Sequence, residues 1–166
     1  MYGSFEILIA FGITPAANLQ IEIWRFVTYG FVHVNAFHAV SNAIVYWMVG
    51  KSVEAKRGAV RVAGVTLLGL VTGGLVAVLF AGPALVGLST AVFALLGYEF
   101  LGSSIRATLI EPRKDWWRLL KELGVIAILV VGLSLVSASA IAHISGLIAG
   151  VLAGRPWHHE PRRPKP

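Results

Sequence analysis

Four polar side chains within uncharged stretches of the sequence have the chemical types needed for acyl transfer. The hydroxyl of a serine such as Ser89 is a weak nucleophile at neutral pH and needs a base within hydrogen-bond reach, which the imidazole of His143 can supply. His38 and Asn42 are four residues apart, so on a helix they share one face. Both can donate to the negative charge that develops on a carbonyl oxygen, and the backbone N–H of Ser89 can add a third donor. These residues predict a site built around a serine nucleophile.

Long uncharged windows predict that these residues lie on helices that span a membrane. Of the 166 residues, 57% are hydrophobic and 13% are charged, and the mean hydropathy is +0.77. A spanning helix needs about 20 residues, and the uncharged windows of 25, 37 and 32 residues are Phe26–Gly50, Val62–Tyr98 and Leu123–Gly154. The second window breaks at Gly82-Pro83 and the third near residues 134–139, so we expect five crossings. The predicted fold class is an all-α, polytopic transmembrane helical bundle.

The basic residues predict the orientation of these helices. Three segments, 51–61, 106–121 and 155–165, hold 13 of the 14 Lys and Arg residues, and five crossings place all three segments on one side. By the positive-inside rule that side is cytoplasmic. The three helices that carry the four polar residues then all run inward, and the four side chains lie at a similar depth near the outer face.

The same topology explains the net charge of +6, so the charge does not predict nucleic-acid binding. We expect residues 1–154 to form one membrane domain in which residues 1–35 are an outer loop region. Residues 155–166 are then a basic, proline-rich cytoplasmic tail that contacts anionic lipid headgroups. The chain has no cysteine, which excludes disulfides and thiol chemistry.

Small residues predict the close helix packing that a serine–histidine pair needs. Gly146 and Gly150 are spaced four residues apart on the last predicted helix, and Ala142 continues the same face. The serine helix offers small residues in the same way, at Gly87, Ala94 and Gly97.

Other interpretations of these residues remain open at this level. A single serine in a membrane helix usually bonds back to its own helix, and an intramembrane histidine can serve packing or a proton path. A metal site built from His33, His38 and His143 is a further alternative, although no carboxylate or cysteine is placed to complete it. A transporter is disfavoured because the sequence shows no inverted repeat.

Three motifs, taken in order, carry a resemblance to a known family. The first is a Trp-Arg segment followed by His-x-x-x-Asn, at Ile23–Thr28 and His38–Asn42. The second is a Gly-x-Ser segment that opens a helix, at Gly87–Gly97. The third is an Ala-His-x-x-Gly segment, at Ala142–Gly150. From about Ile13 to Gly154 the chain resembles the rhomboid family of intramembrane serine proteases.

The resemblance implies a six-helix core and a role for each matching residue. Ser89 would be the nucleophile and His143 the base, while His38 and Asn42 would stabilise the oxyanion. Supporting residues would be Gly87, Phe93, Trp24, Arg25, His33, Gly146 and Gly150. Trp24 and Arg25 would brace an outer loop embedded in the membrane, although Trp24 can equally be an interfacial anchor, and for His33 a structural loop hydrogen bond is favoured over a catalytic role.

The resemblance further implies transmembrane protein substrates, cleaved near the outer face of a prokaryotic cell membrane, with no cofactor and no metal. It leaves the oligomeric state open.

Three departures from the family pattern bear on activity. Thr90 stands where the family usually has glycine, and its β-branch is expected to crowd the approach of substrate. Phe93 replaces a tyrosine, which keeps a ring to pack against His143. Residues Met1–Ile13 are too short to span a membrane and contain Glu6, so we expect the family's first helix to be missing. Thr90 and the missing helix weakly favour the main alternative, a catalytically inactive rhomboid-like protein that binds transmembrane substrates. The retention of Ser89, His143, His38 and Asn42 argues against that alternative, because a binding protein does not need this set.

Overall fold

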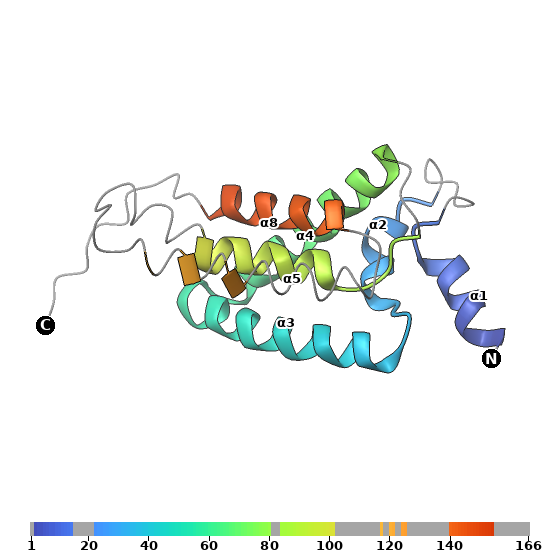
Figure 1. Cartoon of the computed structure of the whole chain (residues 1–166), viewed down its shortest axis with the longest axis horizontal. Coiled ribbons are helices and arrows are strands. Elements are labelled where there is room, and N and C mark those ends of the chain that lie inside the picture. The colour runs from blue at the N-terminus through green and yellow to red at the C-terminus, as the bar shows by residue number, and fades with distance from the viewer. Residues whose placement is uncertain are drawn as a thin grey trace, which may run out of the picture.

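The described part of the chain is a bundle of helices. The computed structural model describes residues 2–14, 22–80, 84–101 and 140–154, together with Trp117, Leu120, Lys121, Gly124 and Val125. Its elements in order are α1 (Tyr2–Phe11), α2 (Arg25–Thr28), η1 (Tyr29–Phe31), α3 (Ala36–Arg57), α4 (Ala59–Leu79), α5 (Ser89–Leu96), η2 (Gly97–Leu101) and α8 (Ala140–Ala153) (Figure 1). Among these residues the only β-type pairing is an isolated bridge between Ile13 and Leu85. The prediction of an all-α fold is confirmed for this part.

Helix α3 begins and ends at residues that cap it. Asn35 has extended backbone angles, and its side-chain oxygen accepts a hydrogen bond from the N–H of His38 at 2.8 Å. At the other end Gly58 adopts a φ of +83°, a conformation that side chains with a Cβ rarely adopt, and the chain turns there into α4. The N-terminal cap fixes the first turn of α3, where His38 lies.

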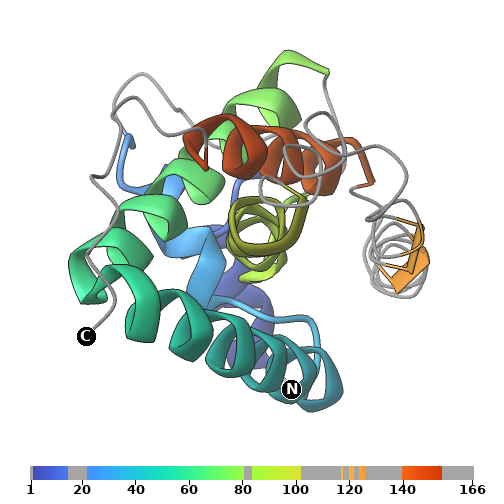
Figure 2. The same cartoon turned by 90° about the vertical axis from the view of Figure 1, so that its left-hand side faces the viewer.

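Helix α5 lies at the centre of the bundle. All eight of its residues are buried, and it is apolar on all sides except at its first two positions, as expected for a helix that is covered by others. The end-on view shows α3, α4 and α8 arranged around it (Figure 2). Helices α3, α5 and α8 run in the same direction and α4 runs opposite to them (Figure 1). The expectation that three parallel helices carry the four polar residues is therefore met in the described structure.

Glycines let α5 and α8 approach each other to backbone contact. A Cβ added at Gly146 would lie 2.4 Å from the carbonyl oxygen of Thr90, and one at Gly150 would lie 1.9 Å from the carbonyl oxygen of Ala94. Both distances are too short for real atoms. Ala142, one turn earlier on the same face, is also buried. The close approach expected from the glycine spacing is thus present, and it brings the first turns of the two helices together.

We expect Gly150→Ala to lower the free energy of unfolding by about 1–3 kcal/mol, the usual cost of forcing an extra group into a packed interface. The neighbour is backbone and cannot rotate away, so α8 must shift along its whole length. Thermal unfolding of the detergent-purified protein measures the effect.

Gly64→Ala on α4 is the matched control, because no atom lies within 4 Å of the added Cβ. Alanine is the better helix former, so this variant should keep its stability or gain up to about 1 kcal/mol. Equal midpoints for the two variants would contradict the close packing of α5 and α8.

Fewer membrane-spanning helices are found among the described residues than the sequence predicts. Among the described helices, α4 is the one that is both long and apolar enough to cross a membrane, and α8 is apolar but shorter. Within the uncharged window Phe26–Gly50 the long helix begins at Ala36, where Asn35 caps it, and only the short helices α2 and η1 precede it. The predicted breaks at Gly82-Pro83 and near residues 134–139, and the tail 155–166, lie outside the described residues. The count of five crossings stays a prediction.

Candidate active site

Ser89 and His143 form a hydrogen-bonded pair in the interior of the bundle. Ser89 is the first residue of α5 and His143 lies in the first turn of α8, 54 residues later. The Ser89 Oγ and His143 Nε2 atoms are 2.7 Å apart, and the two residues are 1% and 0% exposed. If the hydroxyl donates to Nε2, the imidazole must be neutral with its proton on Nδ1. That arrangement allows Nε2 to accept the serine proton.

Phe93 packs against the imidazole of His143. The ring centroids are 4.9 Å apart with an angle of 35° between the planes. Phe93 is fully buried and lies one turn after Ser89 on α5, so both side chains reach the same face of α8. The packing predicted for this ring is confirmed, and it limits the movement of the imidazole.

His38 and Asn42 lie side by side on α3 and face the segment that precedes Ser89. Both are buried, and a Cβ added at Gly87 would lie 2.7 Å from His38 Cε1 and 3.6 Å from Asn42 Nδ2. Gly87 has a φ of +107°, so only glycine fits there both in conformation and in space. The two ring nitrogens of His38 and both side-chain polar atoms of Asn42 have no hydrogen-bond partner among the described residues. Buried polar atoms without partners are costly in a structural role and useful as donors to a ligand.

His33 supports the loop that precedes the serine. Its Nε2 accepts a hydrogen bond from the N–H of Leu88 at 3.4 Å, which is the structural role that the sequence favoured. Its ring also packs edge-on against His38, with centroids 5.0 Å apart. Burial lowers the pKa of His33 below its ordinary value, and a neutral ring is what an acceptor requires. Within the described ranges no three His, Cys, Asp or Glu side chains are grouped closely enough to hold a metal ion.

Three residues of the segment from Leu85 to Leu88 make hydrogen bonds to the N-terminal part of the chain, two through backbone pairs and one to a side chain. Leu85 exchanges two of them with Ile13, at 2.8 and 3.2 Å. The N–H of Gly87 donates to the carbonyl oxygen of Tyr29 at 2.9 Å, and the N–H of Leu88 reaches His33. The N-terminal part of the chain therefore determines where the segment before Ser89 lies.

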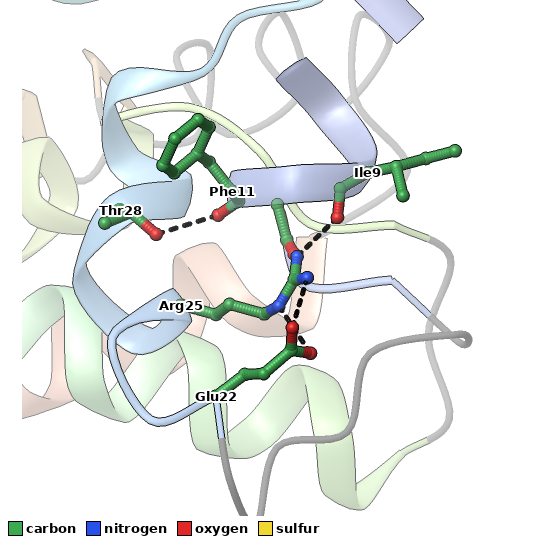
Figure 3. Close-up of polar contacts among 6 residues, drawn as sticks. Ile9, Phe11, Glu22, Arg25 and Thr28 are labelled. Carbon is green, nitrogen blue, oxygen red and sulfur yellow. Dashed lines mark hydrogen bonds and ion pairs between the residues drawn. The ribbon is translucent and has the colours of Figure 1, made fainter. Parts of the chain in front are cut away.

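Arg25 joins α1 to α2, as Figure 3 shows. Its Nη1 donates to the carbonyl oxygens of Ile9 and Gly12 at 2.5 and 2.8 Å, while Nε and Nη2 donate to the carboxylate of Glu22. Thr28 adds a bond to the carbonyl oxygen of Phe11 at 3.0 Å. The last carbonyls of a helix need donors from outside it, and Arg25 and Thr28 supply them for α1.

Trp24 immediately precedes α2, and its carbonyl oxygen accepts from the N–H groups of Val27 and Thr28. Its side chain is 47% exposed, a degree of exposure that suits an interfacial anchor. Its backbone thus takes part in the first turn of α2, and its ring lies at the surface.

Thr90 is placed differently from our expectation. Its side chain does not crowd the surface of the site, since it is fully buried between α5 and α4. A Cβ added at Gly73 of α4 would lie 2.6 Å from Thr90 Cγ2, so Gly73 provides the space for the threonine methyl group. The Thr90 hydroxyl lies 2.7 Å from that of Tyr29. Tyr29 and Gly73 could not be recognised from the sequence, because neither the spacing of an aromatic residue in a loop nor that of a glycine in an apolar helix indicates which residue it contacts.

Comparison with known proteins identifies the family of the chain. A family model described as the Rhomboid domain matches residues 20–159. The proteins named Rhomboid protease GlpG from Salmonella newport, Salmonella heidelberg and Salmonella typhi are each 30% identical to the chain over 141 residues, which cover 80% of this chain and 48% of the relative. The chain spans about half the length of these curated relatives. It belongs to the rhomboid family.

Proposed function

We propose that this protein is an intramembrane serine endopeptidase that cleaves transmembrane helices of other proteins with Ser89 and His143. Rhomboid family members are intramembrane serine proteases, and this coarse assignment follows from the family match. The observation that carries the finer proposal is the 2.7 Å contact between Ser89 Oγ and His143 Nε2, made by two buried side chains from different helices. A serine that served only its own helix would have no need of a buried imidazole 54 residues away.

The residues around this pair supply the remaining parts of acyl transfer. Ser89 Oγ attacks the carbonyl carbon of the scissile peptide while His143 Nε2 takes the hydroxyl proton. The carbonyl oxygen becomes an oxyanion, which His38, Asn42 and the N–H of Ser89 stabilise. The intermediate collapses, the peptide C–N bond breaks, and His143 returns the proton to the leaving amine. Water, activated by the same imidazole, then hydrolyses the acyl-enzyme.

The proposed location of the site follows from the direction of the helices. Helices α3, α5 and α8 run parallel, and the proposed site residues lie in their first two turns, so the site lies at one end of the bundle. Large apolar side chains cover the outside of α3 and α4, as a lipid surround requires, for example Trp47, Val60 and Leu79. With five crossings and cytoplasmic basic loops, that end is the outer one, and a substrate helix is cut where it unwinds near the outer leaflet of a prokaryotic cell membrane.

Cleavage of a transmembrane reporter by the purified protein in liposomes tests the proposal. The reporter is a single helix with a fluorescent tag at each end and a Gly- and Ser-rich stretch near its outer end. We expect two products, with a cleavage position mapped by mass spectrometry to the outer third of the helix. Ser89→Ala, purified in the same way, is the control for contaminating proteases.

Two outcomes would overturn the proposal. Equal cleavage by the Ser89→Ala protein would assign the activity to something else. Saturable binding of the reporter without cleavage, across a panel of reporters whose unwinding sequence varies, would support the alternative of an inactive rhomboid-like binder.

A further inference from the structure

Tyr29 makes hydrogen bonds through both its side chain and its backbone to the segment around Ser89. Its hydroxyl lies 2.8 Å from the carbonyl oxygen of Leu70 and 2.7 Å from Thr90 Oγ1. Its own carbonyl oxygen accepts from the N–H of Gly87 at 2.9 Å. Tyr29 and Thr90 are each completely buried, so water does not compete for these bonds.

The direction of the hydroxyl bonds follows from the number of protons available. A carbonyl oxygen can only accept, so the single proton of the Tyr29 hydroxyl is donated to Leu70. The bond between the two hydroxyls must then be donated by Thr90, with the Tyr29 oxygen as acceptor. The Thr90 proton is therefore committed to Tyr29, and Thr90 does not compete with Ser89 for the imidazole of His143.

These bonds hold the chain on both sides of Ser89. Gly87 precedes the serine by two residues and Thr90 follows it directly, and both are bonded to Tyr29. We propose that Tyr29, acting together with Thr90, is a positioning residue that fixes the first turn of α5 so that the Ser89 hydroxyl points at His143. The inference rests on the proposed function, because it assigns Tyr29 a role in the reactivity of Ser89.

The packing of Thr90 explains why this device is needed in this chain. Helix α5 could rotate slightly about its axis if only apolar contacts held its first turn, because such contacts have no preferred direction. The Thr90 methyl group rests in the space left by Gly73, and its hydroxyl is fixed to Tyr29. Thr90 thereby prevents rotation of α5 about its axis and does not obstruct the site.

The rate at which Ser89 reacts with a fluorophosphonate probe tests the inference. The probe needs no bound helix, so it reports the serine and its base directly. We expect Tyr29→Phe and Thr90→Val to lower the maximal labelling rate about tenfold, the scale of loss that follows small misplacements of reacting groups. Thr90→Ser keeps the donor and should restore most of the rate.

Tyr46→Phe is the matched control. Tyr46 also makes a bond between two hydroxyls, which is partly buried: its hydroxyl lies 3.0 Å from Thr66 Oγ1 across the α3–α4 interface, so this bond joins α3 to α4 and does not involve the residues next to Ser89. We expect this variant to lose stability as Tyr29→Phe does and to keep the labelling rate within about twofold.

The outcomes separate positioning from a general effect on stability. A maximal rate for Tyr29→Phe equal to that of Tyr46→Phe, with the labelled fraction normalised to active protein, would overturn the inference. Equal rates for Thr90→Val and Thr90→Ser would overturn it as well. The double variant Tyr29→Phe with Thr90→Val should be no slower than Tyr29→Phe, because the two groups share one bond.

Failure of the proposed function would look different from failure of this inference. If Ser89 of the unaltered protein is not labelled above the level of Ser89→Ala, the serine is not activated and both ideas are wrong. If it is labelled and the four variants do not differ, only the role of Tyr29 is wrong.

Discussion

His143→Ala is expected to reduce both fluorophosphonate labelling of Ser89 and cleavage of a transmembrane reporter by at least about 10⁴-fold, as removal of one member of a catalytic unit does in serine proteases. Without the imidazole 2.7 Å from its Oγ, the Ser89 hydroxyl has no base to take its proton. Ser89→Ala should remove the labelling altogether. Purified protein in detergent suffices for the first measurement, and liposomes are needed for the second.

The two substitutions should not be additive. Because serine and histidine act as one unit, the double variant should cleave no more slowly than either single variant. His143→Ala also leaves a space beside Phe93, so its unfolding midpoint should fall. His143→Gln is the control for this loss of packing, because glutamine fills the space without providing a base. A His143→Gln protein that keeps more than about a tenth of the cleavage rate would show that another group activates Ser89.

Asn42→Leu is expected to lower the cleavage rate by about 10²–10³-fold, the usual cost of removing one oxyanion donor. Its effect on stability should have the opposite sign. The side-chain atoms of Asn42 are buried and have no partner among the described residues, so an apolar side chain of the same size removes a penalty of about 1–3 kcal/mol. The unfolding midpoint should therefore stay unchanged or rise. His38→Ala should lose activity to a similar degree.

Asn35→Ala provides the contrasting control on the same helix. Its side chain is the N-terminal cap of α3, and its loss should cost about 1 kcal/mol of stability. Activity should follow only as far as the fold is lost. An Asn42→Leu protein that is as active as the parent, or that is destabilised like Asn35→Ala, would assign Asn42 a structural role.

The sequence predicted best those features that depend on chemical type and spacing. The His-x-x-x-Asn pair lies on one face of a helix because four residues make about one turn, and the glycines at positions 146 and 150 face α5 for the same reason. The sequence predicted that Ser89 and His143 can meet, and the two side chains are in contact, while the number of crossings stays a prediction. These features depend on spacing along the chain or on the distribution of charge, and both can be determined from a single sequence.

Features that depend on tertiary contact could not be predicted from spacing. Thr90 was interpreted as an obstruction because its partner Tyr29 lies 61 positions away and in a different element. The acceptors of Arg25 are the backbone carbonyl oxygens of Ile9 and Gly12. Every residue has such an atom, so residue type does not show which of them Arg25 binds. Each of these contacts joins segments whose pairing is decided by the folded chain.

The separation of 54 residues between the two members of the proposed dyad has a consequence for biosynthesis. Ribosomes add about 5–20 residues per second, so the serine helix is made about 3–11 s before the histidine. During that interval the nascent chain contains a serine without a base, beside the translocation machinery and other newly inserted helices. On the proposed mechanism the protein becomes active only when its last described helix has been inserted, so the order of synthesis protects the membrane insertion site from proteolysis.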